Sequence, residues 1–127
     1  MPLVRISLRE GKPAAYRHAI GEAVHRAMVE TINVPALDCF QVISGYSPEE
    51  LLYDPNYLGI DRTDDILFVQ ITLNSGRTVE QKKSLFARIA QLLSEDPGIR
   101  PQDVLINLVE VPPENWSFGN GEAQYAT

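Results

Sequence analysis

Apolar residues recur along the chain with two different spacings, which predict two helices and four strands. In two segments every third or fourth position is apolar, a period typical of an amphipathic helix. The first stripe consists of Tyr16, Ile20, Val24, Ala27 and Met28. The second consists of Leu85, Phe86, Ile89, Leu92 and Leu93. Shorter apolar runs predict strands at residues 3–8, 39–44, 66–73 and 103–111.

Residues with strong conformational preferences mark the ends of both predicted helices. Pro13 suits a first helical turn, and Pro35 bars continuation of the first helix. Thr78 and Gln81 have the spacing of a capping box, and a Pro-Gly pair at 97–98 stops the second helix. The helices are therefore separate elements, each bounded by strands.

The two halves of the chain repeat one another at an offset of 65 residues. The first matched pairs are Leu3 with Phe68, Ile6 with Ile71, Leu8 with Leu73, Gly11 with Gly76, Lys12 with Arg77, Ile20 with Leu85, Val24 with Ile89 and Met28 with Leu93. The later pairs are Asn33 with Gly98, Val34 with Ile99, Asp38 with Asp103 and Phe40 with Leu105. Chance likeness of two amphipathic segments is the alternative. We favour duplication because the register holds through both turns.

The predicted fold is α/β (α+β), with duplicated β-α-β units at about residues 2–44 and 66–111 in a single domain of residues 1–127. Right-handed crossovers place both helices on one face of a four-stranded sheet. Strand 66–73 is almost continuously apolar, which is typical of a strand covered on both faces. We therefore expect another copy of the chain to cover the open face. The connection at 45–65 is long, so we expect a helical turn at 48–52.

The composition argues against several classes of function. A net charge of -6 without a basic stripe disfavours a nucleic-acid partner. The chain has neither an apolar run of membrane-spanning length nor a secretory signal pattern, so we expect a cytoplasmic protein without a membrane partner. Cys39 is the only cysteine, and His18 and His25 have no carboxylate motif between them. We therefore expect no disulfide, metal or cofactor, and expect both histidines to face solvent.

A proline at position 2 that leads directly into a strand, within two β-α-β units, resembles the tautomerase superfamily over the whole chain. Within that superfamily the chain resembles the malonate semialdehyde decarboxylase group in three segments: Val34–Asp38, Arg77 ahead of Glu80–Lys82, and Trp116–Gly121. The last segment is the most specific. The resemblance implies a trimer whose amino-terminal proline acts as a general acid or base.

Pro2 suits that role on its own terms. Removal of Met1, which is common before a small residue, would leave a secondary amine held rigidly by its ring. An α-amino group has a reference pKa near 8, and burial or a neighbouring cation lowers it toward neutrality. The alternatives are a proline at this position by chance, or a retained Met1, which makes the nitrogen a tertiary amide that cannot titrate.

Arg77 is the predicted contact for a substrate carboxylate. It precedes the Thr78 cap, where a cation opposes the helix dipole by about 0.3–1 kcal/mol, and a guanidinium fork matches a carboxylate. A solvated loop arginine is the alternative, supported by Lys12 at the equivalent place in the first half. The resemblance implies a second arginine two residues earlier, where this chain has Ser75. The predicted substrate site therefore includes Ser75 but only one cationic clamp.

Three further residues complete the predicted site. The resemblance implies that Asp38 assists catalysis near Pro2, although its counterpart Asp103 suggests a turn cap instead. It also implies that Trp116 and Phe118 wall the pocket with apolar surface and so desolvate Pro2, the alternative being ordinary packing of the tail.

Tyr46 and Tyr57 are further pocket candidates.

Two reactions fit these residues, and they need opposite protonation states of Pro2. In decarboxylation of a small 3-oxo acid such as malonate semialdehyde, the charged amine polarises the 3-oxo group while Arg77 orients the carboxylate. In keto-enol tautomerisation of a substrate such as phenylenolpyruvate, the neutral amine takes a proton alpha to a carbonyl and returns it to the neighbouring carbon. Asp38 and Arg77 favour decarboxylation, which we expect, while Ser75 weakens it. A non-catalytic oligomeric binding protein is the alternative of another class.

Overall fold

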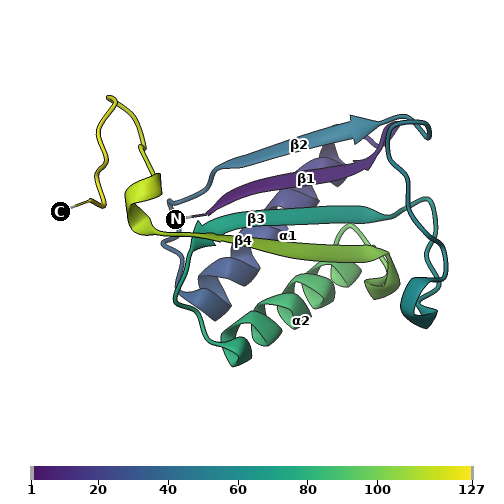
Figure 1. Ribbon diagram of the computed structural model, residues 1–127. Helices are drawn as coiled ribbons and strands as arrows, with labels where there is room; N and C mark the ends of the chain where they lie inside the picture. Colours follow the sequence, from purple (N-terminus) through teal and green to yellow (C-terminus); the bar gives the residue numbers. More distant parts are fainter. Residues whose placement is uncertain (1, 127) are drawn as a thin grey trace.

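The computed structural model describes residues 2–126 and shows a four-stranded sheet with both helices packed on one of its faces (Figure 1). The strands are β1 (Leu3–Arg9), β2 (Gln41–Tyr46), β3 (Leu67–Asn74) and β4 (Val104–Val111), and the helices are α1 (Ala14–Ile32) and α2 (Val79–Glu95). The strand order is β2-β1-β3-β4, with parallel outer pairs and an antiparallel central pair. The predicted fold is confirmed, with strand ends shifted by one or two residues.

The backbone itself carries the internal repeat. Gly11 and Gly76 occupy equivalent turns and have φ angles of 100° and 126°. Asn33 and Gly98 occupy equivalent positions after the two helices, with φ angles of 60° and 98°. These left-handed conformations are open to glycine and tolerated by asparagine. The equivalent turns thus share the same handedness of backbone, as a duplicated unit requires.

The core lies between the sheet and the helices. Alternate residues of β1 and β3 point toward the helices, and the apolar stripes of α1 and α2 point back at them. The most deeply buried members include Val4, Ile6, Ile71, Leu73, Ile20, Val24, Met28, Leu85, Ile89 and Leu93. Each such aliphatic side chain contributes about 1.5–3 kcal/mol by leaving water. Val4 and Ile6 belong to this core, so the first residues of β1 are held in place.

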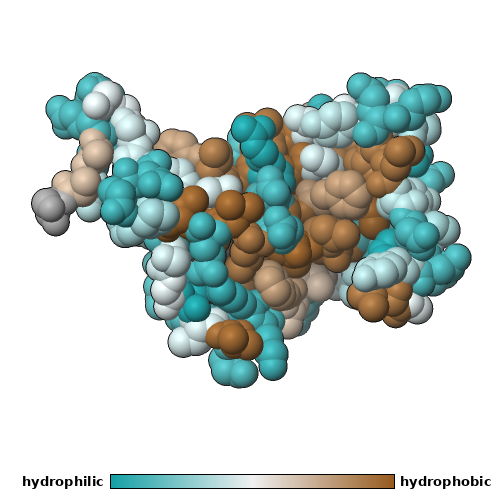
Figure 2. Space-filling view, in the orientation of Figure 1, coloured by the Kyte–Doolittle hydropathy of each residue, from teal (hydrophilic) through white to brown (hydrophobic). Residues whose placement is uncertain are grey.

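The opposite face of the sheet exposes apolar side chains in the described chain. Phe40 is 52% exposed, Val42 and Leu105 are each 44% exposed, and Val109 is 38% exposed. Figure 2 shows hydrophobic surface over the strands, interrupted by a hydrophilic band. Exposed apolar side chains gathered on one face of a sheet are typical of an interaction surface. We call these four residues the open-face cluster.

The connection between the halves is more ordered than the sequence indicates. At the predicted helical turn, the N–H of Leu51 donates to the carbonyl of Ser47 at 3.1 Å, but the segment forms only a single turn. A short 3-10 helix, η1 (Tyr57–Gly59), follows and was not predicted. Arg62 holds this region by donating to the carbonyls of three loop residues, Asp54, Tyr57 and Ile60.

Two more 3-10 turns flank β4: η2 (Pro101–Asp103) and η3 (Pro113–Asn115). Within residues 2–126, neither helix combines the length and apolarity needed to cross a membrane.

Candidate functional site

Four segments converge at the edge of the sheet where β1 begins. Pro2 precedes β1, which runs antiparallel to β3, so Pro2 lies beside the last residues of β3. On the other side, the N–H of Val4 donates to the carbonyl of Phe40 at 3.0 Å, which brings in the segment entering β2. Because β4 is parallel to β3, it ends at the same edge, and residues 112–126 continue from it next to the N-terminus (Figure 1).

Pro2 is buried and borders a cavity of about 260 Å³. The lining residues are Pro2, Leu3, Phe40, Trp116, Ser117 and Phe118. The Trp116 and Phe118 rings are stacked, with centroids 5.4 Å apart, and the Tyr125 ring meets Phe118 edge-on at 5.0 Å. The structure therefore brings the predicted residues Pro2, Trp116 and Phe118 to one cavity. Its walls are mainly aromatic and aliphatic.

Side-chain amides hold the aromatic wall in place. The indole Nε1–H of Trp116 donates to Oδ1 of Asn74 at 2.7 Å. Gln124 binds the next turn twice, because its Oε1 accepts from the N–H of Phe118 at 2.9 Å and its Nε2 donates to the carbonyl of Gly119 at 2.9 Å. Sequence reasoning missed both amides. No local pattern singles out Asn74, because the same strand also contains the polar residues Gln70 and Thr72.

Asp38 lies in the segment that enters β2, with its side chain buried at 7% exposure. The register pairs Val4 with Gln41, so two residues earlier Pro2 is level with Cys39, next to Asp38. Burial, followed by the negative charges of Glu22 and Asp38, raises the pKa of the Cys39 thiol. The structure thus brings Asp38 to the Pro2 edge of the sheet.

The counterpart of Asp38 has a structural role. Asp103 is fully buried, and its carboxylate accepts from both the backbone N–H and the hydroxyl of Thr63, each at 2.7 Å. These bonds tie the connection between the halves to the start of β4. The turn-stabilising role considered for Asp38 is therefore realised at Asp103.

Arg77 lies at the same edge of the sheet but does not line the cavity. Its guanidinium donates to the carbonyls of Asn74 at 3.2 Å and Ile32 at 3.3 Å. Both acceptors are neutral, so these bonds orient the guanidinium without neutralising it. Its charge reaches Glu110, whose pKa is lowered mainly by a hydrogen bond from Lys82 and to a smaller extent by Arg77.

Lys12, the counterpart of Arg77, is used differently. Its ammonium pairs with Asp65 at 2.9 Å and lies 4.9 Å from the centre of the Tyr16 ring. The hydrogen bond to Asp65 raises the pKa of Lys12. Arg77 and Lys12 therefore occupy equivalent positions in the repeat, but Arg77 binds neutral carbonyls whereas Lys12 binds a carboxylate.

The other predicted residues lie outside the cavity. Ser75 is exposed, and its N–H donates to the carbonyl of Val111 at 3.1 Å. Tyr46 is at the opposite end of the sheet, because β2 runs parallel to β1 and Tyr46 is its last residue. Tyr57 is 65% exposed and borders separate hollows beside Arg62.

The two histidines differ in exposure to solvent. His18 is exposed beside Glu22, as predicted, with 3.5 Å between Nε2 and Oε1. His25 was expected to face solvent, and this is wrong, because it is half-buried with Nε2 2.7 Å from the carbonyl oxygen of Ala36. The loop after α1 folds back over this histidine. Within residues 2–126, no three His, Cys, Asp or Glu side chains gather as they would to hold a metal ion.

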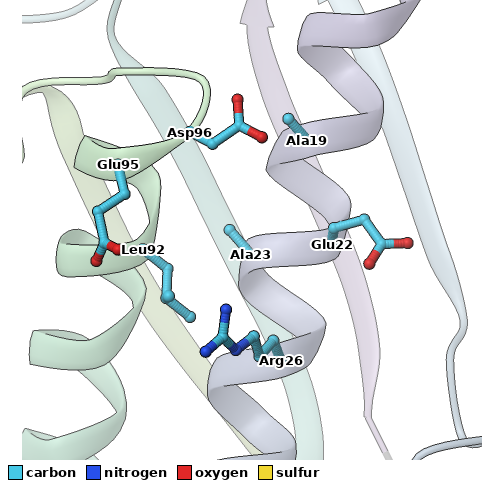
Figure 3. Close-up of a pocket in the computed structure, with 7 residues that line it drawn as sticks. All are labelled: Ala19, Glu22, Ala23, Arg26, Leu92, Glu95 and Asp96. Carbon is cyan, nitrogen blue, oxygen red and sulfur yellow. The ribbon is translucent and has the colours of Figure 1, made fainter.

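A second hollow, of about 230 Å³, lies between the helices (Figure 3). Its lining includes Glu22, Arg26, Glu95 and Asp96 above small apolar residues, and Arg26 is engaged by Glu30 at 3.0 Å. All four charged side chains belong to exposed residues. This hollow shares no residue with the Pro2 cavity, and it resembles a solvated groove between helices rather than a site for chemistry.

Comparisons with known proteins agree on one family. Residues 38–119 match a family model described as "Tautomerase enzyme", and residues 2–59 match a second model with that description. "Probable tautomerase YusQ" of Bacillus subtilis is 44% identical over 124 residues, covering 98% of both chains.

Solved structures show the same fold. FG41 malonate semialdehyde decarboxylase inhibited by 3-bromopropiolate has a TM-score of 0.91 at 36% identity, covering 97% of this chain and 93% of that one. A wild-type fused 4-OT symmetric trimer has a TM-score of 0.78 at 23% identity, covering 94% of each chain.

Proposed function

Because the chain belongs to the tautomerase family, we propose that it is a cofactor-independent enzyme whose working group is the secondary amine of Pro2. The observation that carries the proposal is the cavity of about 260 Å³ in which Pro2 meets Trp116 and Phe118. An amine at an apolar wall has its pKa and its electrostatic effect set by a few neighbours rather than by water. The proposal requires that Met1 be removed in the mature protein.

The proposed substrate is a small carboxylic acid with an oxo group. Its carbonyl group faces Pro2, and its carboxylate points toward Arg77 at the same edge of the sheet. The hydrogen bonds of Arg77 to neutral carbonyls support this assignment, because they leave its positive charge available to an anion. Ser75, in place of a second arginine, leaves one cationic clamp and favours a substrate with a single carboxylate.

The first proposed reaction is decarboxylation of a 3-oxo acid. The protonated amine of Pro2 donates a hydrogen bond to the 3-oxo oxygen, which stabilises the charge that develops there. The bond between C2 and the carboxylate carbon breaks, and carbon dioxide leaves. The electron pair of that bond forms an enolate, whose C2 then takes a proton from solvent. Buried Asp38, at the same edge of the sheet as Pro2, supports this reaction, because a nearby carboxylate favours the ammonium form. The 36% identity to a malonate semialdehyde decarboxylase also supports it.

Keto-enol tautomerisation is the second candidate. The 44% identity to a probable tautomerase favours it, as does Ser75 at the place of the second arginine. In this reaction the neutral amine of Pro2 takes the hydroxyl proton from the C2 oxygen of a 2-oxo acid enol, and the resulting ammonium returns a proton to C3, which leaves the keto form. The two reactions thus differ in whether Pro2 starts charged or neutral.

We further propose that three copies of the chain assemble through the open face. The exposed open-face cluster supports assembly, since burial of such a face removes a large apolar area from water. The fold supports the number three, because the fused 4-OT that shares it is a symmetric trimer. Phe40 belongs both to the open-face cluster and to the cavity lining. A neighbouring copy would therefore also border the cavity.

A side-by-side assay of malonate semialdehyde and phenylenolpyruvate tests this function, with Pro2→Ala as the matched variant. We expect turnover of at least one substrate, lost by about a hundredfold or more in Pro2→Ala, as for removal of a general acid or base. Equal turnover by the two proteins would exclude the proline mechanism. An intact mass that retains Met1, together with no turnover, would favour the non-catalytic binding protein.

A further inference from the structure

We infer that Asn74 is a positioning residue of the Pro2 cavity, acting through the side chain of Trp116. This inference rests on the proposed function, because it concerns the same cavity. Trp116 lines that cavity, and its indole N–H donates to Asn74 Oδ1 at 2.7 Å. The distance is at the short end of the range for N–H···O bonds, and a partly buried indole needs such a partner.

Regular secondary structure does not fix Trp116. It follows η3, where its own N–H makes a long 3.4 Å contact to the carbonyl of Pro113. The ring is oriented by stacking on Phe118 and by the bond to Asn74, which lies 42 residues away in sequence. Of these two contacts, only the bond to Asn74 ties the ring to the sheet.

Asn74 is an anchor because its backbone pairs with the neighbouring strand β4. It ends the central strand β3 and pairs in register with Val111 of β4. The next residue, Ser75, closes this end of the ladder by donating to the carbonyl of Val111 at 3.1 Å. The side chain of Asn74 therefore projects from a strand end that β4 holds in place, at the edge where Pro2 lies.

Asn74 also connects the wall to the proposed carboxylate contact. Its backbone carbonyl accepts from Nη1 of Arg77 at 3.2 Å, while its side-chain oxygen accepts from Trp116. A single residue thus sets the indole and the guanidinium relative to each other. Loss of the side-chain bond alone frees the wall but leaves the backbone contact to Arg77. We therefore expect weaker substrate binding, with a smaller effect on the chemical step.

Fluorescence provides a test that needs no turnover, because Trp116 is the only tryptophan in the chain. Asn74→Ala should shift the emission to longer wavelength and increase quenching by acrylamide, as the indole loses its anchor and meets water. Asn74→Asp keeps an oxygen acceptor at the same place and should retain the wild-type emission. Asn107→Ala is the matched control, because it removes an amide that accepts from Gln70 at 3.1 Å in the same sheet. It should leave the emission unchanged.

Kinetics provide the second readout. Asn74→Ala should raise KM about five- to tenfold, the equivalent of one ordinary hydrogen bond, while kcat changes less. Trp116→Phe keeps an aromatic ring but lacks the N–H, so it should raise KM similarly. Adding Asn74→Ala to Trp116→Phe should then have little further effect. If Asn74→Ala fails to fold, Trp116→Phe carries the kinetic test alone.

Unchanged emission and quenching in folded Asn74→Ala would overturn the inference, whatever the enzyme does. So would an unchanged KM in Trp116→Phe. The failure of the proposed function looks different, because Pro2→Ala would then match the wild type in turnover while the fluorescence of the Asn74 variants still reports the anchor.

Discussion

Asp38 and Asp103 occupy equivalent positions in two copies of one β-α-β plan, and both are buried. In the second half, the carboxylate accepts two 2.7 Å hydrogen bonds from Thr63 and joins the connecting segment to β4. In the first half, the register of β1 and β2 places the same position at the edge of the sheet where Pro2 lies. The duplicated frame therefore supplies a buried carboxylate twice. In the proposed function, only the first copy acts on the amine of Pro2.

The largest expected effect separates the two aspartates by activity. Asp38→Asn keeps the shape of the side chain but removes the charge beside Pro2, so kcat/KM should fall about a hundredfold. Asp103→Asn should keep most of the activity of the protein that remains folded. Steady-state kinetics on both variants makes the comparison. Equal losses of activity would mean that both aspartates are structural.

The hydrogen bonds of Asp103 should matter for the stability of the fold. Asp103→Ala leaves the N–H and hydroxyl of Thr63 without their buried acceptor and should lower the free energy of unfolding by about 2–3 kcal/mol. Thr63→Val removes only the hydroxyl and should cost about 1 kcal/mol. Urea unfolding at neutral pH measures both variants. A loss at Asp103 no larger than that at Thr63 would contradict the proposed double hydrogen bond.

The equivalent glycine turns should respond alike. Gly11 and Gly76 have φ angles of 100° and 126°, and a Cβ at either would meet no atom within 4 Å. The cost of Gly11→Ala or Gly76→Ala is therefore backbone strain alone, about 1–2 kcal/mol each. Thermal unfolding of the two variants side by side checks this. A clear difference between them would show that the turns are not equivalent.

The helix starts should differ between the halves. Thr78 forms a capping box with Gln81, whereas Pro13 precedes α1 without a side-chain cap bond. Thr78→Ala should thus lower the free energy of unfolding by about 1 kcal/mol. Thr31→Ala serves as a control, because Thr31 lies in the last turn of α1, away from the start of either helix. Equal stability of wild type and Thr78→Ala in urea would contradict the role of the box.

The smallest effect concerns the exposed pairing between the helices. Arg88, and then Arg26, hold the pKa of Glu30 below its usual 4.5. Because the folded-state pKa is lowered, this stabilisation is present above the unfolded pKa and is lost as pH falls through the folded value. Glu30→Gln should therefore slightly lower the melting temperature at pH about 7 and lose its effect near pH about 3. A difference that grows on acidification would contradict this sign.

The fold could be predicted from the sequence because the two periodicities are local and are repeated in both halves. The apolar stripes through Ile20 and Ile89 identify the helices, and right-handed connections leave one arrangement of the sheet. His25 shows the limit of this reasoning. Its place on a helix gives no sign that the loop containing Ala36 folds back onto it.

The site could be predicted only in part. The family resemblance identified Pro2, Trp116 and Phe118, and they share a cavity. Asn74 was missed, because its bond to Trp116 joins segments 42 residues apart and leaves no local pattern. The orientation of Arg77 could not be predicted either. Backbone carbonyls hold its guanidinium, and a backbone carbonyl carries no sequence signature.

The most direct test of the central claim is a pH titration of the protein labelled with ¹⁵N-proline. The chain has nine prolines, and all but a free amino-terminal one are tertiary amides that do not titrate. We predict one titrating secondary amine, absent in Pro2→Ala, with a pKa well above about 7 for a decarboxylase and at or below about 7 for a tautomerase. A spectrum in which no proline nitrogen titrates would contradict the account.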